Sequence, residues 1–166
     1  SLEDTIRGYT GLHSLIWFSN TGYLDTTKHH RKSNNAIYTL AVEPDGQLLV
    51  SGIYGTFEGQ PAPCILRLHA DGERDTTFNV PFVWGLAWGI SPLSGGRVLA
   101  TGYFLPNGSS DTLQMVRLLP DGSLDPTFNN NLSAPEGGFG AITAITHTVL
   151  PDNRIVLHGN LSIVDG

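Results

Sequence analysis

The chain has 166 residues, of which 40% are hydrophobic and only 14% are charged, and its formal net charge is -6. The apolar content suits a packed core, while 20 glycines and 10 prolines indicate many turns between short strands and argue against a helical protein. The sequence has no basic face that would favour nucleic acid, no apolar run of the roughly 18 residues that cross a bilayer, and a single cysteine, Cys64.

A phrase of similar sequence occurs three times with a spacing of 50 residues. The three copies are IWFSNTGYLDTTK at 16–28, LRLHADGERDTTF at 66–78 and VRLLPDGSLDPTF at 116–128. A fixed period of this length is the signature of a repeat architecture. We therefore predict one repeat domain over residues 1–166, with successive blades at about 11–59, 60–109 and 110–166.

Each copy of the phrase contains a glycine turn followed by an Asp-x-Thr corner. Glycine supplies the positive φ angle that a tight hairpin requires, and the aspartate can accept backbone N–H bonds from two residues further on. These are predicted to be structural turn residues: Gly22, Asp25, Gly72, Asp75, Gly122 and Asp125. Each corner offers a single carboxylate, so we expect no calcium site.

Apolar strands follow each corner. Strands around Leu40, Leu86 and Ile145 are predicted to pair with those at 48–51, 98–101 and 155–158. Their nearly continuous apolar runs indicate burial on both faces, which is typical of propeller blades. The predicted fold is all-β and β-propeller-like, with three four-stranded blades of about 50 residues, incomplete or open as given. Phe78 and Phe128 are expected to fill the gap between blades, where the first copy has Lys28.

The repeat resembles the delta-60-repeat propeller family of bacterial proteins. The residues that carry the resemblance are Asp71 to Phe78, Asp121 to Phe128 and the tail GNLSIVDG at 159–166. The resemblance implies a secreted or cell-surface protein whose propeller binds or spaces other modules, and it supplies no catalytic residues.

The two ends of the repeat array differ. The third copy stops at Gly166 without its final strand, and the first copy begins with an additional strand at 15–18. Unpaired blade edges invite another chain. Two interpretations follow: the chain is a piece of a longer propeller, which we favour, or its copies complete one another by strand exchange.

No catalytic constellation, metal site or cofactor site is predicted. The polar loop at 28–35, with Arg31 and Lys32, is expected to be solvated, and His147 and His158 are expected to face one another as a packed or hydrogen-bonded pair. Aromatic residues near strand ends are the candidate ligand contacts. They are Trp17, Tyr54, Trp84, Trp88 and Tyr103.

These observations predict a non-catalytic extracellular binding or spacer module, with a protein or glycan partner, and no enzyme. The alternative is a self-assembling structural subunit that forms a ring or fibre by strand complementation. A third hypothesis is a propeller enzyme whose site is assembled on the channel face from several blades.

Overall fold

The structure is a computed structural model, and it describes residues 14–129, 132 and 145–159. These residues form ten strands and one short 3-10 turn, η1 (Ser94–Gly96). The strands are β1 (Ile37–Val42), β2 (Leu48–Gly52), β3 (Thr56–Phe57), β4 (Gln60–Pro61), β5 (Ile65–Leu68), β6 (Phe82–Pro92), β7 (Val98–Pro106), β8 (Leu113–Leu118), β9 (Ile145–Val149) and β10 (Ile155–Gly159). The all-β prediction is confirmed.

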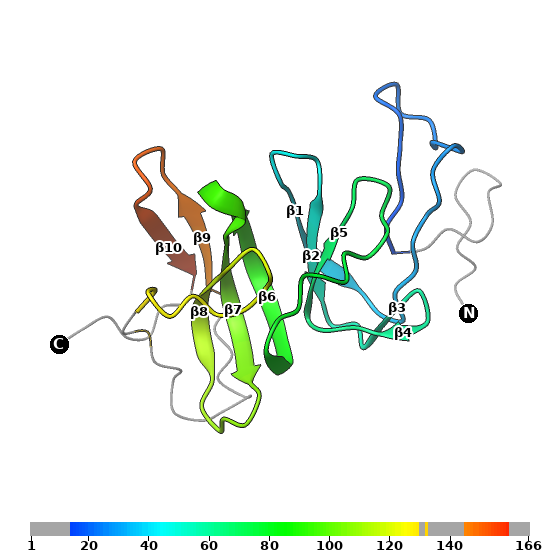
Figure 1. The fold of residues 1–166 in the computed structure, drawn as a ribbon. Helices are drawn as coiled ribbons and strands as arrows, with labels where there is room; N and C mark the ends of the chain where they lie inside the picture. The colour runs from blue at the N-terminus through cyan, green and yellow to red at the C-terminus, as the bar shows by residue number, and fades with distance from the viewer. Residues whose placement is uncertain (1–13, 130–131, 133–144, 160–166) are drawn as a thin grey trace.

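The strands form separate antiparallel sheets that follow one another along the chain (Figure 1). The first sheet has the order β1-β2-β5 and the second β6-β7-β8, while β9 and β10 form a third, two-stranded sheet. The short hairpin β3-β4 lies between β2 and β5 in sequence. Among the described residues no helix is long and apolar enough to cross a membrane.

The predicted strand pairs are confirmed by their registers. Leu40 pairs with Val50, and Ile90 pairs with Ala100 at the corresponding place in the second sheet. In the third sheet Ile145 pairs with Gly159. A fourth segment joins the outer edge of the first two sheets only through single bridges, Leu68 to Arg74 and Leu118 to Leu124.

The sheets group the strands across the boundaries that the period suggested. β5 pairs with β2, and β8 pairs with β7, so positions 59/60 and 109/110 each fall inside a sheet. A repeat of 50 residues has the same period whichever residue is counted as its first, so the sequence period does not fix where a blade begins. The hydrogen bonds between strands show which of them share a sheet. The prediction that the third copy stops at Gly166 without its final strand concerns residues outside the described part, and so does the VDG tail.

The core lies between the sheets. One buried cluster joins residues of the first sheet, such as Leu49 and Ile65, to residues of the second, such as Ala87 and Val98. Phe78 is fully buried in this cluster, which confirms that it fills the space between two blades. The central strand β7 is buried on both faces through most of its length, as its continuous apolar sequence predicts.

Candidate functional site

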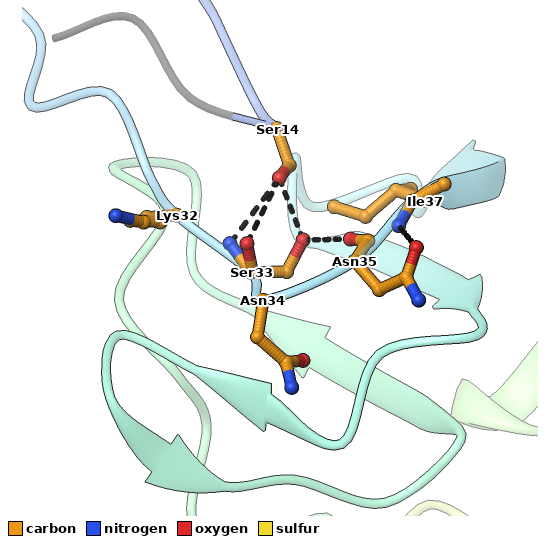
Figure 2. A pocket seen from close by; sticks show the side chains of 7 residues that line it. Ser14, Lys32, Ser33, Asn34, Asn35 and Ile37 are labelled. Atoms are coloured by element: carbon orange, nitrogen blue, oxygen red, sulfur yellow. Dashed lines mark hydrogen bonds between the residues drawn. The ribbon is translucent and has the colours of Figure 1, made fainter. Parts of the chain in front are cut away.

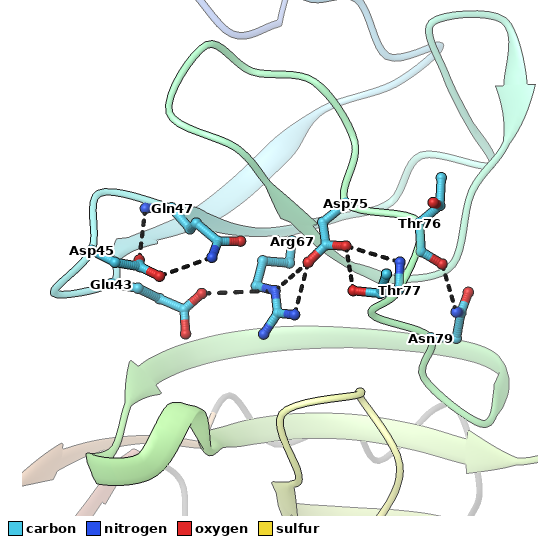
Figure 3. A network of polar contacts seen from close by, with 8 residues as sticks. All are labelled: Glu43, Asp45, Gln47, Arg67, Asp75, Thr76, Thr77 and Asn79. Carbon is cyan, nitrogen blue, oxygen red and sulfur yellow. Dashed lines mark hydrogen bonds and ion pairs between the residues drawn. The ribbon is translucent and has the colours of Figure 1, made fainter.

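The Asp75 corner is a network of charge-assisted hydrogen bonds (Figure 3). Its Oδ1 accepts bonds from the backbone N and the Oγ1 of Thr77, at 2.8 and 2.6 Å. Its Oδ2 lies 2.8 Å from Nε and 2.7 Å from Nη2 of Arg67. Burial alone would raise the pKa of Asp75, but these bonds from Thr77 and Arg67 lower it to about 2.

The third copy repeats the geometry of the second. Asp125 accepts bonds from Thr127 at 2.9 and 2.6 Å and lies 2.7 Å from Nε of Arg117. In both copies the arginine also lies 4.8 Å from the ring centre of the phenylalanine that ends the phrase, Phe78 or Phe128. The corner is therefore a unit of aspartate, threonine, arginine and phenylalanine.

The first copy lacks both the arginine and the phenylalanine. Trp17 stands where the other copies have arginine, and Lys28 where they have phenylalanine. Asp25 keeps its two bonds from Thr27, at 3.0 and 2.6 Å. Sequence reasoning found the aspartates but missed Arg67 and Arg117, although their spacing of 50 was a sufficient signal.

Polar bonds also link neighbouring sheets through their inner strands. Thr39 Oγ1 donates to the Ala87 carbonyl at 3.0 Å, and the Ala87 N donates to Ser51 Oγ at 3.0 Å. Thr101, which stands 50 residues after Ser51, lies 2.8 Å from Nδ1 of His147 in the third sheet. Ser51 and Thr101 occupy the same position in successive repeats. Ser51 therefore joins the first sheet to the second, and Thr101 joins the second to the third.

The predicted pairing of His147 with His158 is wrong. His147 pairs with Leu157, and His158 with Thr146, so the two imidazoles project from opposite faces of the hairpin. His147 is buried, and its Nε2 lies 2.9 Å from Ser91 Oγ. Burial lowers its pKa to about 4, so the ring is neutral at pH 7 and serves as a contact between sheets.

Two of the five candidate aromatics contribute to packing in the first repeat. Tyr54 is 5% exposed, and its hydroxyl donates to the Val50 carbonyl at 3.1 Å. Trp17 packs against the first sheet and stacks on His30, with ring centres 6.2 Å apart.

The other three candidate aromatics do not form one patch. Trp84 contacts Tyr103 edge-on, with ring centres 5.3 Å apart, whereas Trp88 stacks on Tyr38 of β1 at 6.0 Å. Trp84 and Trp88 are four residues apart on β6, and strict alternation along a strand would place both on one face. A β-bulge between Ala87 and Gly89 interrupts the alternation of β6 and turns Trp88 toward the first sheet.

A polar pocket of about 370 Å³ lies where the chain enters β1 (Figure 2). Ser14, Ser33 and Asn34 line it. Ser33 Oγ donates to Ser14 Oγ at 2.6 Å, and Asn34 Oδ1 accepts bonds from the backbone N atoms of Gly55 and Thr56, both at 2.9 Å. These polar atoms bind one another and the neighbouring backbone, so the pocket presents no set of converging catalytic groups.

A second cavity, of about 430 Å³, has Arg31 in its lining. The prediction of a solvated loop is wrong for this residue, which is only 5% exposed. Its guanidinium lies 2.6 Å from Glu73 and 3.7 Å from Glu58. Two carboxylates therefore accompany the buried cation, and the cluster fastens the segment that follows the first copy of the phrase to the second copy.

The thiol of the chain and possible metal ligands are further candidate sites in the part of the chain that the structure describes. Cys64 is buried, and burial raises the pKa of its thiol to about 12, which suppresses the nucleophilic thiolate. No group of three histidine, cysteine, aspartate or glutamate side chains gathers to hold a metal ion among those residues.

Apolar side chains on the outer faces of the first and third sheets are exposed. Side chains at the equivalent positions between two sheets are buried. Leu40 is 47% exposed, whereas Ile90, at the corresponding register position, is 8% exposed because it packs on the first sheet. At the other end of the array Val156 is 46% exposed, and its counterparts Leu49 and Leu99 are fully buried. We call these the β1 face (Leu40 and Val42) and the β10 face (Thr148 and Val156).

Comparison with known proteins identifies the repeat. No curated protein and no solved structure matches the chain. Two stretches, residues 43–78 and 94–128, match a family described as a domain of unknown function (DUF5122) beta-propeller. Each stretch ends on the phenylalanine that completes an Asp-x-Thr corner. Together with the all-β fold and its open sheets, these matches show that the chain is built from β-propeller repeats.

Proposed function

We propose that the chain is a non-catalytic binding or spacer module that packs through its β1 and β10 faces against further propeller repeats. The observation that carries this proposal is the contrast in exposure between matched positions. Leu40 and Val156 are nearly half exposed, while Ile90 and Leu49 at the equivalent places are covered by a neighbouring sheet. Apolar side chains that a repeat normally buries gain free energy when another repeat covers them.

The non-catalytic part of the proposal is supported by how the polar groups are used. The aspartates of the corners bind threonine and arginine, and His147 joins two sheets. The first two contacts fix the corners within a repeat, and the third joins two sheets. We place the module outside a bacterial cell, secreted or at the surface, because its repeat resembles that of the delta-60-repeat propellers.

An alternative is that the further repeat belongs to a second copy of this chain. The first and third sheets lie at opposite ends of the row of sheets (Figure 1), so packing of the β1 face of one copy on the β10 face of another is a heterologous contact that produces rings or fibres. This alternative makes the chain a self-assembling structural subunit.

One experiment tests both versions. The solution mass is measured by light scattering over a dilution series for the wild type, for Leu40→Asp and Val156→Asp, and for Val83→Asp as a control on an exposed residue outside both faces. Weak association that disappears on dilution, and that is absent in both face variants, supports docking of other repeats. A discrete oligomeric mass that persists on dilution supports self-assembly. A wild type that stays monomeric at every concentration contradicts docking through these faces.

A binding role for the module finds its best support at Tyr38. Tyr38 is 53% exposed, and its ring stacks on Trp88 of the neighbouring sheet. An exposed aromatic face backed by a second ring suits stacking on a sugar or on an aromatic side chain of a protein. Titration with cellohexaose, followed by tryptophan fluorescence, is expected to quench the wild type and leave Tyr38→Ser unchanged. An equal response of the two proteins would rule out Tyr38 as the contact.

A further inference from the structure

The junctions between successive sheets carry opposite charge. Between the first and second sheets the arginine of the corner, Arg67, has a second carboxylate beside it, because Glu43 Oε2 lies 4.0 Å from its Nε (Figure 3). Glu43 is 6% exposed, so this carboxylate occupies the inside of the junction. A neighbouring cavity of about 390 Å³ is lined by Glu43 and Asp45.

The junction between the second and third sheets lacks that carboxylate and has an additional cation. The residue 50 positions after Glu43 is Leu93, and the residue 50 positions after Gln47 is Arg97. The groups that remain are Arg97, Arg117 and Asp125, with a net charge of +1, whereas Glu43, Arg67 and Asp75 give -1. The second junction is thus at least two formal charge units more positive, since Asp45 beside Glu43 also has an uncharged counterpart, Gly95.

A cavity of about 280 Å³ opens at this more positive junction. Both Arg97 and Arg117 line it, and its apolar wall includes Leu93, Phe128, Val149 and Ile155. The Arg117 side chain is 21% exposed, compared with 11% for Arg67, and Phe128 is partly exposed where Phe78 is fully buried. Solvent therefore reaches Arg117, whereas Glu43 covers the corresponding arginine, Arg67, at the first junction.

We infer that this cavity binds a small carboxylate with a short apolar tail, held by Arg97 and Arg117 in the place that the Glu43 side chain fills at the first junction. Arginine presents several N–H donors in a planar fork that matches a carboxylate. Two of the Arg117 nitrogens are engaged, by Asp125 and Thr127, in bonds that hold the guanidinium in position. The apolar wall favours an acid with a few methylene groups over a strongly hydrated inorganic anion.

Two chemical sources of such a carboxylate are possible, a free short-chain acid and the C-terminal carboxylate of a peptide. Both share the group that the arginines recognise. The site does not depend on the β1 and β10 faces, so it stands if the chain is strictly monomeric.

The test is an NMR titration of the arginine Nε–H resonances with sodium butyrate, its uncharged analogue butyramide, and an acetylated peptide that ends in a free alanine. Butyrate is expected to shift Arg97 and Arg117 in a saturable manner, while butyramide and matched sodium chloride do not. A response to the peptide at lower concentration than to butyrate would assign the natural source as a chain terminus, and the reverse would assign a free acid.

Two variants make the test specific. Arg97→Gln restores the residue type of the first junction and is expected to weaken butyrate binding about tenfold. Leu93→Glu supplies the carboxylate from within the chain and is expected to abolish binding. Gln47→Arg, the matched control at the first junction, leaves binding unchanged because Glu43 already fills the corresponding place. The absence of saturable shifts in the wild type, or equal affinity in Arg97→Gln, would overturn the site.

Discussion

Replacing Glu43 by leucine is expected to stabilise the protein at neutral pH. Glu43 is nearly buried, and its Oε2 has no hydrogen-bond partner among the described residues, only the ion pair with Arg67 at 4.0 Å. The second sheet already carries leucine at the matched position, Leu93, so the fold accommodates that side chain.

The size of the effect follows from three opposing contributions. Attraction between unit charges 4 Å apart is about 4 kcal/mol at an effective dielectric constant of 20. Burial nevertheless raises the pKa of Glu43 above its ordinary value of 4.5 despite Arg67, so desolvation of the carboxylate exceeds that attraction. Leucine adds about 1 kcal/mol of apolar burial beyond the methylene groups of glutamate. The net gain at pH 7 is therefore about 1 to 3 kcal/mol, or about 3 °C in Tm for each kcal/mol.

The pH dependence identifies the cause. Because the folded-state pKa of Glu43 is raised, protonation of this group contributes stability that is fully present below about pH 4.5 and is lost as the pH rises through the folded-state pKa. The advantage of Glu43→Leu should therefore grow as the pH rises above 4.5 and then level off.

The assay is urea unfolding followed by circular dichroism between pH 4 and pH 8. Glu43→Gln is the matched control: it removes the charge and keeps the shape, and it should show the same pH profile with a smaller gain. A loss of stability at pH 7 in both variants would show that the pair with Arg67 stabilises the fold, and it would refute the reasoning.

Three further predictions concern glycine packing and acid stability. A Cβ at Gly102 would lie 2.0 Å from a backbone oxygen of β6, so Gly102→Ala should destabilise the fold by more than about 3 kcal/mol in urea unfolding. Gly22→Ala, where a Cβ meets nothing within 4 Å and only the φ of +83° is unfavourable, should cost about 1 kcal/mol; equal losses would contradict the steric argument. Since burial lowers the pKa of His147 to about 4, its neutral form contributes stability above about pH 6.5 that is lost toward pH 4; His147→Asn should remove this part of the acid transition in thermal melts, and an unchanged transition would contradict it. Asp75 and Asp125, with pKa values of about 2, contribute stability above about pH 4 that is lost as the pH falls to 2; Asp125→Asn should flatten this lower step, and a variant with the wild-type slope would contradict it.

The turns and corners were predictable because their requirements are local. A tight turn needs the positive φ that Gly72 and Gly122 adopt, at 85° and 87°, and the Asp-x-Thr bonds join residues two apart. The strand pairs followed from the short turns between them. These features depend on few residues that are close in sequence.

The grouping of strands into blades depends on long-range contacts, and so do the burial and orientation of the aromatic side chains. Tyr54 looks like any residue near a strand end, yet its hydroxyl finds the Val50 carbonyl and the ring is buried. The bulge that separates Trp88 from Trp84 has no clear signal in the sequence. Glu43 and Arg97 were missed for another reason: they are departures from the repeat, and they become visible only when the copies are compared position by position.

The measurement that tests the central claim most directly is the solution mass of an equimolar mixture of Leu40→Asp and Val156→Asp. Each variant has one damaged face and one intact face, so one productive contact remains between the two proteins when the β1 face of one packs on the β10 face of the other. The account predicts that each variant alone is monomeric and that the mixture forms a heterodimer and no larger species. A mixture that remains monomeric at concentrations where the wild type associates would contradict the claim that these faces are complementary halves of a junction between propeller repeats.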